Sequence, residues 1–352
     1  MNWENFQLNA YTLTEKDVVN LTKEIVKVYE VALKGIISKM EKAYAQVLAN
    51  VNKDEYYAKM IQYNRLNKIF MQMTKEYSQA AAKFNKLIIE AGNLAFSNTF
   101  YRKLYAGNWL DPTLGSAVVP QSLIDISVLG TEGAFKNYKA SVLGKGIDYM
   151  PKRGTLSELL KLNKERTLIA LRNGITSGLQ QGMSVRNIIN EIKSVLGMAN
   201  IKDDVFTSNG NLSNLLRIVR TETTRVMNDG NYASSLYAQS KGINIKKMWL
   251  ATLDMKTRPV HAELDSDTQE IEKFFESGAG LVMRPGQFSN VGQNANCRCT
   301  IIDIINDEKP SIRMGTNPDT GKTETFSYKS FDQWAKDNNI VKTKTGKFVK
   351  KT

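Results

Sequence analysis

The chain has 352 residues, enough for two or three domains, and its 42% hydrophobic residues can bury a substantial core. It contains no run of about 18 apolar residues and no basic segment followed by an apolar one at the N-terminus, so we expect neither a membrane-spanning helix nor a secretory signal. Its two cysteines, spaced Cys-x-Cys, do not form a disulfide framework, which favours a reducing compartment.

The net charge of +13 is unevenly distributed along the chain. Residues 1–110, 111–200 and 306–352 each carry a surplus of four or five cations, whereas residues 201–305 carry 12 Lys/Arg and 12 Asp/Glu. Excess positive charge favours binding to polyanions through counterion release, and it also favours solubility. We therefore predict nonspecific contact with DNA, although charge alone does not identify the DNA-binding residues.

The N-terminal part is predicted to be a helical arm over residues 1–110. Residues 15–50 are expected to form one long helix, because their apolar residues recur at helical spacing. A second apolar stripe follows over residues 56–94, after a short polar break, which predicts an antiparallel helical hairpin. Residues 111–154 are rich in glycine and proline, so we expect a linker there.

Residues 155–305 are predicted to form a separate domain in which helices pack on a small sheet. The hydrophobic period changes from helical to strand-like along this segment. The expected elements are helices over residues 155–182, 184–197 and 211–228, a turn at Asp229-Gly230, and strands over residues 247–253 and 300–305.

The last segment, residues 306–352, is predicted to be a basic C-terminal tail. It should contain a hairpin turn at residues 317–322, a short helix at residues 331–335 and a flexible cationic end at residues 342–351. The predicted fold class is therefore α+β and predominantly helical, with a long N-terminal helical hairpin and C-terminal helices packed on a small β-sheet.

The only histidine and the only two cysteines, His261, Cys297 and Cys299, lie within 39 residues of one another. On a strand the two cysteines would point to the same face, with Cα atoms about 6.5–7 Å apart, near the limit for a disulfide. Zinc binds Cys sulfur, His nitrogen and carboxylate oxygen, with four ligands in a structural site. We therefore predict a zinc site with Asp254 as the preferred fourth ligand, and with Asp265 or water as alternatives.

Two other interpretations of these residues remain open. The cysteines can be buried small hydrophobic residues, with His261 a hydrogen-bonded core residue. Alternatively, His261-Ala262-Glu263 followed by a cysteine pair is similar to the motif of zinc deaminases, in which the Glu shuttles protons to zinc-bound water. The Cys-x-Cys spacing, and Asn296 where that motif has proline, depart from the deaminase pattern.

Six short motifs follow one another in the second half of the chain: Arg220-Thr221-Glu222-Thr223, Asn228, Trp249 with Asp254, Thr257-Arg258 with His261, Arg284-Pro285-Gly286, and Asn296-Cys297-Arg298-Cys299. In this order they resemble the phage head-morphogenesis family, the minor head proteins similar to the F protein of phage Mu. The resemblance covers roughly residues 165–305 and does not extend to residues 1–150.

The resemblance implies a minor capsid protein of a tailed phage or prophage, and no enzyme. Such a protein would be made in the host cytoplasm and reside in the virion, in the capsid interior or at the portal. Its partners would be the portal protein, a capsid or scaffolding protein, and phage DNA. It would act in head assembly and in DNA packaging or ejection. The alternatives are a zinc-dependent hydrolase or deaminase-like enzyme carried in the virion, and a DNA-binding architectural protein with no capsid role.

No catalytic residue comes with the resemblance, and we expect structural roles for the shared positions. Arg220 and Glu222 are expected in buried ion pairs, and Trp249 in the core. Arg258 is expected to pair with Asp254, and Pro285 to form a turn with the glycine that follows it.

Overall fold

The computed structural model describes residues 3–48, 65–110, 156–181, 183, 185–196, 210–240, 244–305, 307 and 309–351. The described residues fall into two compact units. Val18–Ala91 and Leu156–Val219 belong to one, which we call the helical unit, and Met1–Asp17, Gly92–Thr155 and Arg220–Thr352 belong to the other, the sheet unit. The predicted linker, residues 111–154, lies outside the described residues, and the predicted domain boundaries stay a prediction.

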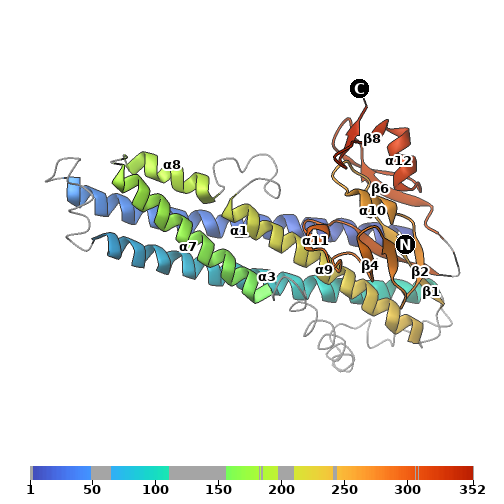
Figure 1. The fold of residues 1–352 in the computed structure, drawn as a ribbon. Helices are drawn as coiled ribbons and strands as arrows, with labels where there is room; N and C mark the ends of the chain where they lie inside the picture. The colour runs from blue at the N-terminus through green and yellow to red at the C-terminus, as the bar shows by residue number, and fades with distance from the viewer. Residues whose placement is uncertain are drawn as a thin grey trace. The chain divides into compact units, whose positions relative to one another are not determined.

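The N-terminal helices are α1 (Trp3–Leu48) and α3 (Arg65–Leu110), and their parts that belong to the helical unit form the expected antiparallel pair (Figure 1). The hydroxyls of Tyr29 and Tyr77 are 2.6 Å apart, and the Tyr29 ring stacks on Phe84 with centroids 5.9 Å apart. Further along α1, Lys39 pairs with Glu76 of α3. Later residues of one helix thus face earlier residues of the other, which confirms the predicted hairpin.

Two more helices, α7 (Leu156–Gln180) and α8 (Val185–Leu196), pack together in the same unit. Ile188 and Ile192 of α8 are fully buried, whereas Arg186 and Lys193 are exposed, so the helix is amphipathic. A Cβ atom at Gly178 of α7 would lie 2.5 Å from Cγ1 of Ile188, so only glycine permits this close approach.

Helix α9 (Asn211–Ser240) is continuous, and the turn predicted at Asp229-Gly230 is wrong. The Asp229 carboxylate is held by Arg225 one helical turn earlier, at 2.7 Å, and by Arg284 at 2.6 Å, so it does not form a turn of its own. Every residue from Thr221 to Gly230 is buried although most of them are polar. Such residues need hydrogen-bond partners, and these position the candidate site.

The sheet unit contains a three-stranded antiparallel sheet in the order β2-β1-β5. The predicted strands are confirmed as β1 (Ile245–Leu250) and β5 (Thr300–Ile305), and β2 (Thr268–Glu270) adds an edge. The register pairs Trp249 with Ile301 and Lys247 with Asp303. The chain between the strands forms α10 (Pro259–Glu263), β3 (Phe275–Ser277), β4 (Gly280–Val282) and α11 (Val291–Asn294).

The C-terminal segment is more ordered than the sequence predicts. Its elements are β6 (Ile312–Thr316), β7 (Thr323–Ser327), α12 (Phe331–Asp337), β8 (Ile340–Lys342) and β9 (Phe348–Lys350). The predicted hairpin turn and short helix are confirmed. The predicted flexible end at residues 342–351 is wrong, because β8 and β9 form a hairpin and the Phe348 ring packs 4.8 Å from that of Phe331.

This segment shares a hydrophobic core with the chain around the sheet. Phe331 and Trp334 are fully buried and pack with Leu253 and Ala262. The Thr316 backbone N–H donates to the Leu253 carbonyl at 2.8 Å. None of the described helices is long and apolar enough to cross a membrane. The α+β, predominantly helical fold class is confirmed.

Candidate metal centre

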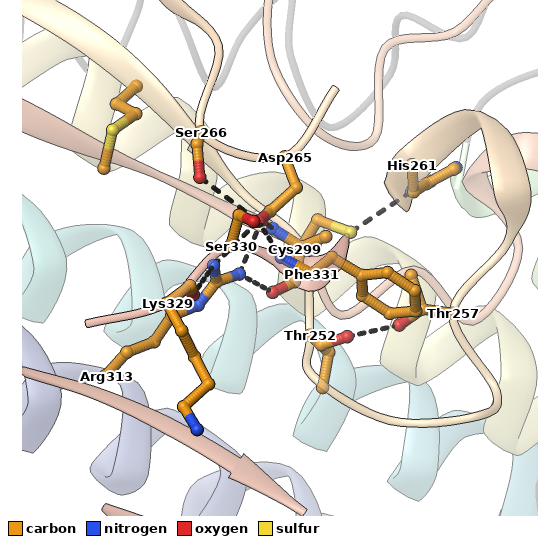
Figure 2. Close-up of polar contacts among 12 residues, drawn as sticks. Thr252, Thr257, His261, Asp265, Ser266, Cys299, Arg313, Lys329, Ser330 and Phe331 are labelled. Atoms are coloured by element: carbon orange, nitrogen blue, oxygen red, sulfur yellow. Dashed lines mark hydrogen bonds and ion pairs between the residues drawn. The ribbon is translucent and has the colours of Figure 1, made fainter. Parts of the chain in front are cut away.

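His261, Cys297 and Cys299 converge in the structure, and we call them the His/Cys cluster. Nδ1 of His261 lies 3.2 Å from Sγ of Cys299 and 3.6 Å from Sγ of Cys297. All three ligand atoms lie within 4.8 Å of one another, and no side chain of the group is more than 3% exposed. Figure 2 shows the imidazole on α10 directed at the Cys299 sulfur.

Local structure on both sides holds these residues in place. Helix α10 begins directly after Arg258, whose guanidinium donates to the carbonyls of Gln293 and Ala295, in and just after α11. The same chain continues into Asn296, which has a positive φ of +54° and donates its backbone N–H to the Thr221 hydroxyl at 3.0 Å. Arg258 thus ties the histidine-bearing helix to the segment that carries the cysteines.

The walls of the cluster are apolar and aromatic. The rings of Phe288 and Trp249 lie 5.0 and 5.9 Å from the His261 ring, and Phe275 packs edge-on against Trp249. Nε2 of His261 is buried and has no hydrogen-bond partner among the described residues. In such surroundings a net charge would be poorly solvated.

The two thiols differ in acidity because of their surroundings. A hydrogen bond with Cys299 lowers the pKa of Cys297, and the nearby Arg258 and Arg298 add to this effect against the opposing effect of burial. Burial is the main reason why the pKa of Cys299 is raised well above its ordinary value. The first thiolate is therefore expected at Cys297.

Asp254, the preferred fourth ligand, is not brought to the cluster. Its Oδ1 accepts from Nη2 of Arg298 at 3.0 Å and from the Lys256 N–H at 2.9 Å, and its Oδ2 accepts from Nη1 of Arg298. The expected partner of Asp254 was Arg258, and that prediction is wrong. Side chains alternate along an extended chain, so Arg298 points away from the cysteines on either side of it and binds Asp254 instead.

Asp265, the alternative fourth ligand, is also occupied elsewhere. Its two oxygens accept from both terminal nitrogens of Arg313, at 2.5 and 2.7 Å. They also accept from the backbone N–H groups of Ala251 and Phe331, at 2.8 and 2.7 Å. Figure 2 shows this arrangement, which joins the sheet to β6 and α12 through a buried ion pair. The sequence did not identify Arg313, because it lies 48 residues from its partner.

Glu263, which the deaminase interpretation needs beside the metal, lies at the surface. Its side chain is 55% exposed and pairs with Lys342 at 3.4 Å. The group of converging ligand atoms does not include it. The arrangement of zinc and proton-shuttling glutamate is therefore not formed.

The remaining motif residues bind the loop around Pro285 to α9. Arg225 is 1% exposed and pairs with Glu222 at 2.9 Å, and Arg284 pairs with Asp229 from the loop. The expected buried ion pair is thus present for Glu222, while Arg220 is half-buried on the same helix. Trp249 is fully buried, as predicted.

The glycine of the Arg284-Pro285-Gly286 motif has a specific packing role. Gly286 has a φ of +89°, a conformation that favours glycine. A Cβ atom there would lie 3.0 Å from Cβ of Arg225. The expected turn is therefore pressed directly against α9.

Polar side chains on one face of α9 position the strand that follows the cysteines. The Asn228 amide donates to the Cys299 carbonyl at 3.1 Å and accepts from the Ile301 N–H at 3.0 Å. Asn231 donates to the Ile301 carbonyl, and Ser235 donates to Asp303 at 2.7 Å. Of these, only Asn228 was singled out in the sequence. Asn228, Asn231 and Ser235 are spaced by three and then four residues, which is helical spacing. A search for apolar stripes does not find them because they are polar.

Lys247 was also missed by sequence analysis. It is fully buried in β1, and its Nζ donates to the Met283 carbonyl at 2.9 Å and lies 5.0 Å from the centre of the Phe275 ring. Burial, with a smaller contribution from Arg284, lowers its pKa to about 7. The sequence does contain an indication of this burial, because Lys247 alternates with Ile245 and Trp249 and therefore lies on the same face of the strand as these two apolar residues.

Comparison with known proteins agrees with the motif order. Residues 170–302 match the family described as Phage Mu protein F like protein. We call this matched segment the Mu F-like domain. The family resemblance is thereby confirmed, and the matched residues include α9, β1, β2, the first part of β5 and the His/Cys cluster.

Two relatives differ in how much of the chain they share. The minor head protein GP7 of Bacillus phage SPP1 is 24% identical over 324 residues, which cover 91% of this chain and 93% of that protein. The NAD(+)–arginine ADP-ribosyltransferase EFV of Enterococcus faecalis is 30% identical over 182 residues, 52% of this chain. The chain spans about a third (34%) of the length of that transferase. No solved structure matches the chain.

Proposed function

We propose that the chain is a minor head protein that acts at the portal, in head assembly and in DNA packaging or ejection. The observation that carries this proposal is the similarity to a minor head protein over nearly the full length of both chains. The Mu F-like domain supports the same role. The proposed partners are the portal protein, a capsid or scaffolding protein, and phage DNA, and the proposed location is the virion.

The proposed role is structural and not enzymatic. The transferase shares only about a third of its length with this chain, so the similarity does not carry its activity over. The one carboxylate that the deaminase interpretation requires is exposed and pairs with Lys342. The Mu F-like motif residues instead form hydrogen bonds, ion pairs and close packing within the domain.

The assembly role predicts where the chain is found. In a phage or prophage that encodes it, mass spectrometry should detect the chain in purified particles and together with the portal protein. Deleting its gene should leave heads with less packaged or less deliverable DNA. Complementation with a Glu263→Ala variant should restore infectivity, because an assembly protein does not need that carboxylate. Absence of the chain from purified particles would refute the proposal.

The proposed DNA contact rests on where the excess charge lies. The segments of the helical unit carry 20 Lys/Arg and 12 Asp/Glu, whereas residues 220–305 carry 10 of each. Lys27 and Lys34 on α1 and Lys161 and Arg166 on α7 are exposed to solvent. Exposed Lys and Arg side chains can contact DNA phosphates, and such contacts do not depend on the base sequence.

The helical unit is therefore expected to supply the phosphate contacts. A Lys27→Gln/Lys34→Gln variant should bind duplex DNA more weakly, with the slope of log K against log salt reduced by up to about 2. Titrations at several salt concentrations measure both. The matched control is Lys256→Gln/Lys273→Gln, two exposed lysines of the balanced segment, which should leave the slope unchanged. A wild-type slope near zero would remove DNA contact from the proposed function.

A further inference from the structure

The His/Cys cluster offers three soft or borderline donors that share one small volume. The imidazole nitrogen lies 3.2 and 3.6 Å from the two sulfurs, separations that fit donors at about 2.0–2.3 Å from a single ion. The donors come from two segments, with His261 on α10 and the cysteines 36 and 38 residues later. The fold therefore brings the histidine to the cysteine pair from a distant part of the chain.

The charge of the site decides which ion it suits. Two thiolates and a neutral imidazole carry a charge of −2, which a divalent cation cancels. A neutral complex can be buried among Phe288, Trp249 and Phe275, where an uncompensated charge would be costly. A monovalent copper ion would leave one negative charge in this apolar volume, although thiolates also favour Cu(I).

We propose that Cys297 Sγ, Cys299 Sγ and His261 Nδ1 bind one Zn²⁺ ion. Binding displaces the two thiol protons to solvent, so that two thiols and Zn²⁺ give a neutral complex and two H⁺. No other described His, Cys, Asp or Glu side chain joins the three donors, so an exogenous donor such as water completes the four-coordinate shell. Asp254 and Asp265 stay with their arginines and are not ligands.

The ion would act as a cross-link within the Mu F-like domain. It would join α10 to the segment that precedes β5, and so close the chain that contains β2, β3, β4 and α11. These strands are short, only three residues each, and contribute few hydrogen bonds of their own. A metal link stabilises such a region because the unfolded chain has no preformed site.

The test is the metal content of the full-length protein. Elemental analysis of protein purified without chelator should find about one zinc per chain, and Cys297→Ser and Cys299→Ser variants should each lose most of it. The matched control is Asp254→Asn, which removes a carboxylate that the sequence favoured as a ligand and should leave the stoichiometry unchanged. A loss of zinc in Asp254→Asn equal to that in the cysteine variants would overturn the proposed ligand set.

A second measurement uses only the wild-type chain, in case the cysteine variants fail to fold. After zinc removal, Co²⁺ should restore the thermal unfolding temperature and give sulfur-to-cobalt charge-transfer and tetrahedral ligand-field absorption bands. Three results would overturn the proposal: a folded, metal-free protein with two free thiols, an intramolecular Cys297–Cys299 disulfide, or stoichiometric copper in place of zinc. None of them bears on the head-assembly role, which is tested separately.

Discussion

Replacing Lys247 by methionine should stabilise the protein at pH 6. Each pKa unit is worth about 1.36 kcal/mol, so the lowering of its pKa from 10.5 to about 7 corresponds to a gain of up to about 5 kcal/mol. The physical reason is that the folded protein encloses this ammonium between Tyr232 and Phe275, with Arg284 nearby. Among the described residues no carboxylate is its hydrogen-bond partner. Methionine has a similar length and needs no solvation.

The gain should depend on pH in a defined direction. Below pH 7 the lysine is protonated in both folded and unfolded states, and its full cost is present. Between pH 7 and 10.5 the unfolded chain keeps the proton that the folded chain has lost, so the wild type gains stability as pH rises and its difference from Lys247→Met shrinks. Above about pH 10.5 the charge-dependent part of the difference should vanish.

Denaturant unfolding followed by tryptophan fluorescence measures this, because Trp249 and Trp334 are both fully buried in the sheet unit. The control is Lys246→Met on the opposite face of β1, where the lysine is partly exposed and paired with Asp307. That variant should show no comparable gain at pH 6. A gain for Lys247→Met that is the same at pH 6 and pH 10 would show that the buried charge is not its cause.

Replacing Asp265 by alanine should have a large effect in the opposite direction. Removing one partner of a buried ion pair typically costs about 3–5 kcal/mol, because the other charge remains buried. Here Arg313 is 4% exposed, and the N–H groups of Ala251 and Phe331 would also lose their acceptor. The free energy of unfolding, from denaturant titration at neutral pH, should fall accordingly.

Two companion variants separate the buried charge from other causes. An Asp265→Ala/Arg313→Met double variant should lose less stability than the single variant, because it leaves no unpaired guanidinium. Glu263→Ala breaks the exposed pair with Lys342 and should change stability little. A double variant that is no more stable than Asp265→Ala would argue against the unpaired charge as the source of the loss.

The helices and strands that could be predicted are those that the spacing of apolar residues along a short stretch of sequence determines. The long helices follow from apolar spacing, and β1 and β5 from short apolar runs ending in polar turns. The His/Cys cluster could be predicted because the chain has one histidine and two cysteines, so few combinations were possible. These features need no knowledge of which distant segments meet.

The wrong predictions share a physical cause: the structure at these positions depends on contacts with residues that are distant in the sequence. Asp229-Gly230 has the composition of a turn, but Arg284, 55 residues later, holds Asp229 within a helix. The lysine-rich end has the composition of a flexible tail, but Phe348 packs on Phe331 and the hairpin forms. Arg258 and Arg298 are equally suitable partners for Asp254 by charge, and only the direction of the chain at Cys297–Cys299 selects Arg298.

Two asparagines of α9, Asn228 and Asn231, have a consequence for how copies of this protein behave when crowded. Both backbone hydrogen-bonding groups of Ile301 are bonded by side chains, the N–H by Asn228 and the carbonyl by Asn231. An incoming strand from a neighbouring molecule would have to displace both amides before it could pair there. Helix α9 thus protects the β5 edge of the sheet from pairing with strands of neighbouring molecules when the protein is concentrated.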